Sequence, residues 1–291
     1  MSQSEEEIKS YALKSPVVLV AGIASIKEIN KYAPEGYRPD DILPGAKSVI
    51  ALGGTPPTLG SWDTPPKYLS EAGPTAAGIA ARAVGLSYWL EGRFGTKAVY
   101  SVIYPSMGGR YGGAIPWQSI KLHAEMAGLG KRSLMGQVIL NPEYGFMDYS
   151  SVITTLDLKP DGPLKEKVCP DPICVTMYEK QGTTLCIGGC PFDCLSGEIE
   201  NGEIKEARYD RYHCLAVSMR DRAHGIFIRR AIKSALEGKD AEMKQILYGE
   251  EFGNAQLMLA YGGQRYYANC WECVRSCPIV QRGVERGAKR K

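Results

Sequence analysis

The first 168 residues of this 291-residue chain contain no cysteine, and all nine cysteines lie between Cys169 and Cys277. The chain also lacks a run of 18 apolar residues, which excludes a membrane-spanning helix. Its acidic first residues lack the apolar stretch of a secretory signal. These absences predict a cytoplasmic protein with no membrane partner. Thiols stay reduced in that compartment, so we expect the cysteines to be metal ligands rather than disulfides.

The chain carries little excess charge of either sign. A formal net charge of +3 is too small to indicate a nucleic-acid partner by itself. The composition, 44% hydrophobic and 23% charged, is typical of a globular protein that buries a core. The length fits one large domain or two modest ones.

A proline- and charge-rich connector, residues 158–167, separates the cysteine-free part from the cysteine-rich part. We therefore predict two domains, residues 1–160 with mixed helices and strands and residues 161–291 with the cysteines. In the first domain, β-branched runs alternate with amphipathic stretches. The expected strands are Val17–Ala21, Ser48–Leu52, Ala98–Tyr104 and Val152–Leu156, and the expected helices are Thr75–Phe94 and Pro116–Ala127. Gly95 stands where a glycine ends the first helix.

Two Cys-x3-Cys-Pro endings dominate the second domain. One is Cys186-x3-Cys190-Pro191, and the other is Cys273-x3-Cys277-Pro278, which Cys270 precedes by two intervening residues. A ferredoxin-type ligand run for a [4Fe–4S] cluster finishes in this way. Each cubane takes four thiolates, so two endings predict two [4Fe–4S] clusters.

In two-cluster ferredoxins the cysteine before proline ligates the cluster of the other run. Applied here, that rule predicts two ligand sets. Cluster one takes Cys169, Cys174, Cys186 and Cys277, and cluster two takes Cys190, Cys214, Cys270 and Cys273. Cys194 is then spare. Because the spacings before Cys186 are irregular, Cys194 could instead replace Cys169 or Cys174.

Other readings of the cysteines stay open. They are one cluster with spare thiols, a structural zinc site, and a thioredoxin-like pair at Cys270 and Cys273. The residues between Cys214 and Cys270 read as a helical insert, about 215–265, with helices at Arg220–Ala235 and Asp240–Tyr248.

Several segments in this order resemble the epoxyqueuosine reductase family and its relatives, the reductive dehalogenases. These are Ile42–Gly53, Ala124–Gly130, Leu140–Gly145 with Val152–Leu158, Arg208–Cys214, and the cysteine order that ends in Cys277-Pro278. The resemblance covers about residues 15 to 280.

The resemblance implies an α+β architecture. A nitroreductase-like, corrinoid-binding N-terminal domain would be followed by a ferredoxin-like domain with two [4Fe–4S] clusters and the helical insert. Electrons would come from a donor such as a ferredoxin or flavodoxin and pass through the clusters to a cobalamin, for reduction of a small substrate. The residues near the corrin would be Ala127, Gly128, Leu129, Gly130, Ser133 and Leu134. Alternatively, Gly128 and Gly130 only end a helix.

Two departures from the family pattern argue against tRNA as the substrate. The family places a proton-donating aspartate ahead of the helix that ends in Ala-Gly-Leu-Gly, but residues 112–116 contain no acid here. The family's C-terminal helical repeats are also missing. Tyr104 and Tyr111 are then the candidate proton donors, because a tyrosine of lowered pKa can protonate an intermediate. We expect His123 to be structural, and Lys121 to form a solvated pair with Glu125.

Two other functions remain open at this stage. The chain could be an electron-transfer protein, or an activator that reduces the cobalt of another protein, in each case without its own corrinoid. A flavin could also occupy the nitroreductase-like pocket in place of the corrinoid.

Overall fold

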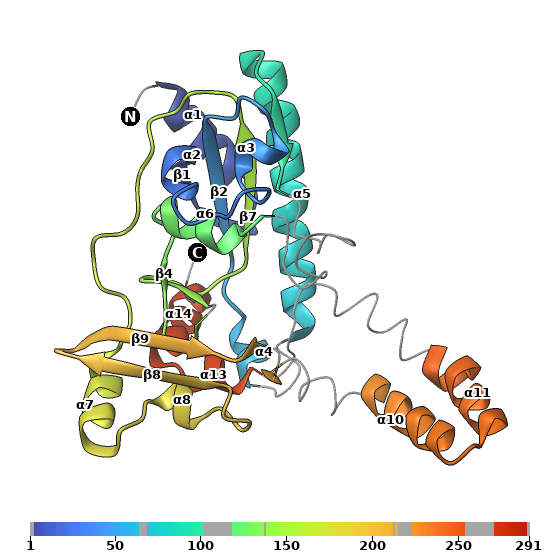
Figure 1. Cartoon of the computed structure of the whole chain (residues 1–291). Helices are drawn as coiled ribbons and strands as arrows, with labels where there is room; N and C mark the ends of the chain where they lie inside the picture. The colour runs from blue at the N-terminus through green and yellow to red at the C-terminus, as the bar shows by residue number, and fades with distance from the viewer. Residues whose placement is uncertain are drawn as a thin grey trace.

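The computed structural model describes residues 3–63, 69–101, 118–136, 138–211, 213–214, 223–253 and 271–289. A layered α+β part lies at one end of the molecule and the cysteine-rich part at the other (Figure 1). Among the described helices, none combines the length and the apolar character that crossing a membrane needs.

The first part is built on a four-stranded sheet in the order β1-β2-β7-β3. The strands are β1 (Val18–Ser25), β2 (Ser48–Gly54), β7 (Tyr149–Thr154) and β3 (Ala98–Tyr100), and all neighbours run antiparallel. The four strands predicted from β-branched runs are thus present. The last one begins and ends earlier than predicted, and residues 102–104 of the third lie outside the described part.

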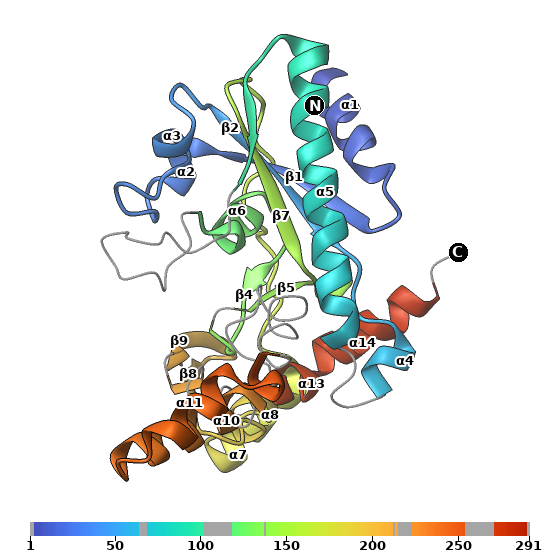
Figure 2. The same ribbon diagram turned by 90° about the vertical axis from the view of Figure 1, so that its right-hand side faces the viewer.

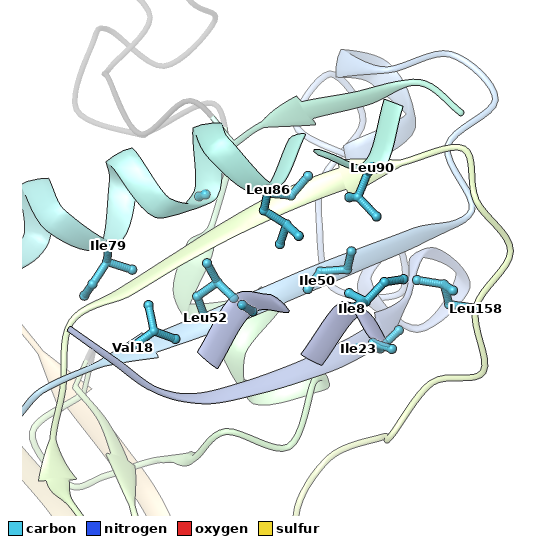
Figure 3. Close-up of a cluster of buried hydrophobic side chains, with 12 residues drawn as sticks. Ile8, Val18, Ile23, Ile50, Leu52, Ile79, Leu86, Leu90 and Leu158 are labelled. Atoms are coloured by element: carbon cyan, nitrogen blue, oxygen red, sulfur yellow. The ribbon is translucent and has the colours of Figure 1, made fainter. Parts of the chain in front are cut away.

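Two helices cover one face of this sheet. They are α1 (Gln3–Leu13) and α5 (Leu69–Phe94), and their apolar faces join strand residues in one core (Figure 3). The predicted face of α5 is confirmed, because Ile79, Ala83, Leu86 and Leu90 are all fully buried. The helix begins six residues before the predicted start. It ends at Gly95, whose φ of +62° suits glycine.

Three short helices cover the other face: α2 (Ile26–Ile29), α3 (Pro39–Ile42) and α6 (Ile120–Met126). Figure 2 shows α5 and α6 on opposite sides of the sheet. The predicted helix that ends at Ala127 is shorter than expected. Ser119 caps α6 by accepting a hydrogen bond from the Leu122 N–H, and residues 116–117 lie outside the described part.

The cysteine-rich part combines short helices with two small sheets. One sheet is β4 (Lys131–Arg132), β5 (Ile139–Asn141) and β6 (Gly145–Phe146), and the other is the hairpin of β8 (Leu195–Glu200) and β9 (Glu203–Tyr209). The helices are α4 (Leu59–Asp63), α7 (Pro172–Gln181), α8 (Leu185–Gly188), α13 (Glu272–Arg275) and α14 (Pro278–Ala288).

The core around the cysteines also takes residues from the first predicted domain. Trp62, Leu134, Met135 and Leu140 pack with Cys186 and Cys277 in one buried cluster. The Trp62 indole N–H also donates to Gln281 Oε1 at 3.1 Å. A boundary at residue 160 therefore stays a prediction, and this core extends across it.

The predicted helical insert contains α10 (Ala223–Leu236) and α11 (Asp240–Tyr248), close to the predicted ranges. The two helices pack against each other, and Figure 1 shows them to one side of the other helices and strands.

Candidate functional site

Four thiols gather where α7, α8 and α14 begin. Cys174 and Cys186 lie in the first turns of α7 and α8, and Cys277 is the residue before α14. Burial, with smaller contributions from the neighbouring thiols Cys186, Cys277 and Cys174, raises the pKa of Cys169 to about 12, and a backbone hydrogen bond at Leu134 opposes the change. Burial, with charges at Cys186 and Cys174, also raises the pKa of Cys277 to about 11. We call Cys169, Cys174, Cys186 and Cys277 thiol set one.

A second group of thiols gathers at the base of the β8–β9 hairpin. Cys194 lies in hydrogen-bonding contact with Cys190 and Cys214, and its burial, followed by these two neighbours, raises its pKa to about 12. Tyr209 interacts with Cys214, Cys273 and Cys194. We call Cys190, Cys194, Cys214 and Cys273 thiol set two. Cys270, which the sequence assigns to the same cluster, lies outside the described residues.

The two thiol sets adjoin at Cys190, which also interacts with Cys186 of set one. Cys277 thus lies beside Cys186 and Cys174, and Cys190 lies beside both Cys186 and Cys194. The division of these thiols between two clusters by the crossing rule stays a prediction. Cys194 lies beside Cys190 and Cys214, and its alternative role in place of Cys169 or Cys174 stays untested.

The donor chemistry of both sets fits iron–sulfur clusters. None of the eight described cysteines forms a disulfide. Within the described ranges no three His, Cys, Asp or Glu side chains converge closely enough for a single metal ion. In a cubane each thiolate binds a different iron, so its thiols surround a volume rather than a point. Whether each set holds a cluster stays a prediction.

The residues expected near a corrin lie between α6 and β5 and are packed against the chain itself. Ala127, Leu129, Ser133 and Leu134 are between 1% and 5% exposed. A Cβ on Gly128, whose φ is +74°, would lie 2.6 Å from the Gly162 carbonyl oxygen. A Cβ on Gly130 would lie 2.7 Å from the Leu140 carbonyl oxygen. The two glycines thus allow the backbone at Gly162 and Leu140 to approach them closely, in the place where the resemblance implied a corrin. A corrinoid beside these residues stays a prediction.

Lys121, at the start of α6, has charged neighbours that the sequence analysis did not predict. The pKa of Lys121 is lowered to about 8, chiefly by the protein that crowds around it and in part by Arg132, while Asp148 opposes the change. The residue itself is exposed to solvent. The expected pair of Lys121 with Glu125 is not formed, because Glu125 instead binds Arg132, with Nε and Oε2 2.9 Å apart.

Tyr149, next to Asp148, has a buried hydroxyl with no hydrogen-bond partner among the described residues. Burial, followed by the charge of Asp148, raises the pKa of this phenol well above its usual value. Unpaired buried hydroxyls are uncommon and often face a ligand or a water. An Asp-Tyr pair at the start of a strand gave no signal in the sequence, because its meaning depends on α6 packing nearby.

His123 is buried inside the α6 face, as expected for a structural histidine. Its Nδ1 lies 2.8 Å from the Ser151 hydroxyl, which donates to the Ser101 hydroxyl, also at 2.8 Å. Burial lowers the pKa of the ring to about 3. The ring is therefore neutral near pH 7 and cannot serve as a cationic acid. The candidate donors Tyr104 and Tyr111 lie outside the described residues.

A surface hollow of about 560 Å³ lies beside thiol set one. Its walls include Val168, Pro170 and Val175, and Lys167 and Arg282 contribute cationic groups. Arg282 is paired with the buried Asp171 at 2.5 Å, whereas Lys167 has no ion pair among the described residues. The hollow thus combines apolar walls with positive charge, next to two candidate ligands.

No protein-family profile matches the chain, and no curated protein matches it. Solved structures do. An epoxyqueuosine reductase from Bacillus subtilis matches at 16% identity and a TM-score of 0.53, over 96% of this chain and 66% of the reductase. An epoxyqueuosine reductase with an epoxyqueuosine-modified tRNA-Tyr stem loop matches at 17% identity and a TM-score of 0.53, with the same coverage.

A catabolic reductive dehalogenase in complex with 3-bromo-4-hydroxybenzoic acid matches at 16% identity and a TM-score of 0.53, over 92% of this chain and 38% of the dehalogenase. The chain thus spans less than two thirds of the length of each of these proteins. The resemblance predicted from the sequence is confirmed at the level of the fold: this chain is folded like epoxyqueuosine reductases and reductive dehalogenases.

Proposed function

We propose that the protein is an iron–sulfur reductase that passes electrons through two [4Fe–4S] clusters to a cobalamin, for the reduction of a small substrate. The gathering of eight thiols into two adjoining sets carries this proposal. Thiols of this number and spacing, with no disulfide among those described, suit two cubanes better than any other cofactor in proteins.

Electrons would enter at thiol set one and leave through set two. The hollow supports entry at set one, because Val168, Pro170 and Val175 in its walls are the sequence neighbours of the candidate ligands Cys169 and Cys174. Lys165 and Lys167 are exposed in the segment leading to it and have no ion pair among the described residues. Positive charge attracts and orients an acidic partner, so we propose a small acidic redox protein, such as a ferredoxin or flavodoxin, as the donor.

A bound cobalamin would supply a strongly reducing, nucleophilic metal centre. By the family pattern it would be held beside residues 127–134. The buried hydroxyl of Tyr149, which has no hydrogen-bond partner among the described residues, and the ammonium of Lys121 in α6 are two polar groups that could face a bound molecule.

Reduction of most organic substrates also consumes a proton. Lys121 suits this role, because a pKa of about 8 leaves its ammonium mostly charged at pH 7 yet able to release a proton readily. Asp148 would orient the ammonium and favour its charged form. We propose Lys121 as the proton donor, in place of the aspartate that residues 112–116 lack.

One observation favours a second function, electron transfer without a bound corrinoid. The residues that would flank the corrin are almost completely buried, and the space beside Gly128 and Gly130 is filled by the protein's own backbone. In that case the protein would deliver electrons to a partner, as a carrier or as an activator of a corrinoid protein.

Anaerobic purification tests both functions. We expect about eight irons per chain for two cubanes. Added cobalamin should bind stoichiometrically, with the absorption spectrum of its base-off form. Eight irons without cobalamin binding would replace the reductase with the electron carrier. A chain that holds zinc alone would refute the cluster assignment.

A further inference from the structure

Cys194 is the thiol that the ferredoxin pattern does not require, yet the structure fixes it firmly. It is 3% exposed and immediately precedes β8. Its carbonyl oxygen accepts a hydrogen bond from the Asp210 N–H at 2.9 Å, and the Asp210 carbonyl accepts one from the Cys214 N–H at 3.0 Å. Backbone hydrogen bonds therefore connect the positions of Cys194 and Cys214.

The turn before Cys194 directs it back toward Cys190. Asp193 adopts a left-handed conformation with φ of +52°, which non-glycine residues seldom take. The Cys194 N–H then donates to Cys190 Sγ at 3.3 Å. The Cys194 thiol is also in hydrogen-bonding contact with the sulfurs of Cys190 and Cys214. A thiol beside the Cys190 sulfur could therefore reach an iron that Cys190 would hold.

We propose that Cys194 is a reserve ligand of cluster two, able to take over the iron that Cys190 binds. This inference rests on the proposed function. In the exchange the Cys190–iron bond breaks and a Cys194–iron bond forms. The proton of the Cys194 thiol passes to Cys190, so no electron is gained or lost. Cys190 is more exposed than Cys194, so an oxidant would reach it first.

The exchange would also change the cluster. With Cys190 bound, its sulfur accepts the Cys194 N–H, and hydrogen bonds to ligand sulfurs are among the factors that set the reduction potential of a cluster. With Cys194 bound, that hydrogen bond is lost. We therefore expect cluster two to have a lower reduction potential when Cys194 holds it.

The test is the iron content and the EPR spectrum of cysteine-to-alanine variants that elute at the same position as the wild-type protein. Cys190→Ala should keep about eight irons per chain, with the signal of cluster two retained at a lower potential. Cys190→Ala with Cys194→Ala should lose about four irons and that signal. Cys194→Ala alone should keep both clusters.

Cys273→Ala is the matched control. Cys194 lies beside Cys190 and Cys214, so we do not expect it to replace Cys273, and this variant should lose cluster two even when Cys194 is present. If Cys190→Ala loses cluster two as completely as Cys273→Ala, Cys194 is not a reserve ligand. That result leaves the proposed function intact, whereas a wild-type protein without iron would refute the function itself.

Discussion

His123 illustrates how burial fixes the charge of a single residue. The folded protein holds its pKa near 3, against 6.5 when unfolded, so between these values the unfolded state binds more protons. The contribution of the neutral ring to the free energy of unfolding is therefore complete well above pH 6.5 and is lost as the pH falls from 6.5 toward 3. Between pH 7.5 and 5.5 the loss should be roughly 1.4 kcal/mol.

Amide hydrogen exchange in β7, measured at both pH values, checks this expectation without unfolding the clusters. The His123→Gln variant keeps a side chain that can reach Ser151 but does not titrate, so its exchange should change less over the same interval. Equal pH dependence in the two proteins would assign the acid sensitivity to other groups.

Lys121 should titrate near pH 8, far below an ordinary lysine. Reductive ¹³C-methylation followed by NMR reports this pKa directly, and Lys121→Arg identifies the signal. Two neighbours give opposite expectations. Asp148→Asn removes a negative charge and should lower the pKa further, and Arg132→Gln removes a positive charge and should raise it. Shifts of the same sign in both variants would contradict the electrostatic explanation.

The sequence alone was sufficient to identify the cysteines as candidate metal ligands, because that role is indicated by their spacing. The cysteines were recognised because thiols and prolines recur at fixed intervals. The structure brings Cys277 beside Cys186 and Cys174, and the ligand sets themselves stay a prediction. Lys121 was interpreted as a solvated partner of Glu125. Its environment comes from Arg132 and Asp148, which only tertiary packing brings near, so no local pattern reports it.

At the scale of elements, α14 is held by a contact between two glycines and the backbone opposite. A Cβ on Gly283 would lie 2.2 Å from the Tyr144 carbonyl oxygen, and a Cβ on Gly145 would lie 2.7 Å from Val280 Cα. The helix therefore packs directly on β6. Because Cys277 is the residue immediately before α14, this contact also positions a thiol of set one.

Gly283→Ala should push α14 away from β6 and destabilise the protein by roughly 1–3 kcal/mol, as overpacking does. We also expect cluster one to be lost or weakened selectively, measured as iron content and EPR signal. Gly92→Ala in α5 is the control, since a Cβ there meets no atom within 4 Å and should be tolerated. An unchanged cluster one in a destabilised Gly283→Ala protein would separate the helix contact from the ligand.

The β8–β9 hairpin is an element that the sequence analysis did not predict. Asn201 and Gly202 both have positive φ, and they connect β8 to β9. An Asn-Gly pair between two alternating runs is a strong hairpin signal, and it was present in the sequence. The two-residue strands β4 and β6, by contrast, are too short for any periodicity to reveal.

At the scale of the whole molecule, the surface beside set one is expected to receive the electron donor. Replacing Lys165 and Lys167 by glutamate should slow cluster reduction by an acidic flavodoxin or ferredoxin at least several-fold, with a weaker dependence on salt. Reduction by a small-molecule reductant should change little. Stopped-flow absorbance of the clusters measures both rates.

The control is the double variant Lys27→Glu with Lys97→Glu, which changes the net charge by the same amount. These two lysines lie at the end of the sheet where β1 ends at Ser25 and β3 begins at Ala98, away from α7 and α8 (Figure 1). If both double variants slow the protein donor equally, net charge rather than this surface governs the encounter.

The positions of the cysteines predicted the order of the two parts along the chain, but not that the parts share core residues. In the sequence, the connector at residues 158–167 separates the cysteine-free part from the cysteine-rich part. In space, Leu134, Met135 and Leu140 still belong to the core that contains Cys186 and Cys277. The sequence shows which stretches lack cysteine. It does not show which distant residues pack in the same core, because that depends on the fold.

The crossing of Cys277 into thiol set one has a consequence for biosynthesis. Cys277 follows Cys186 by 91 residues, so at ordinary rates of translation the first three thiols of the set wait roughly 5–18 s for the fourth. The sheet is already complete by then, because its last strand in the sequence ends at Thr154. The proposed cluster one would thus be completed late in synthesis, and its first three thiols would need protection until the ribosome has passed Cys277.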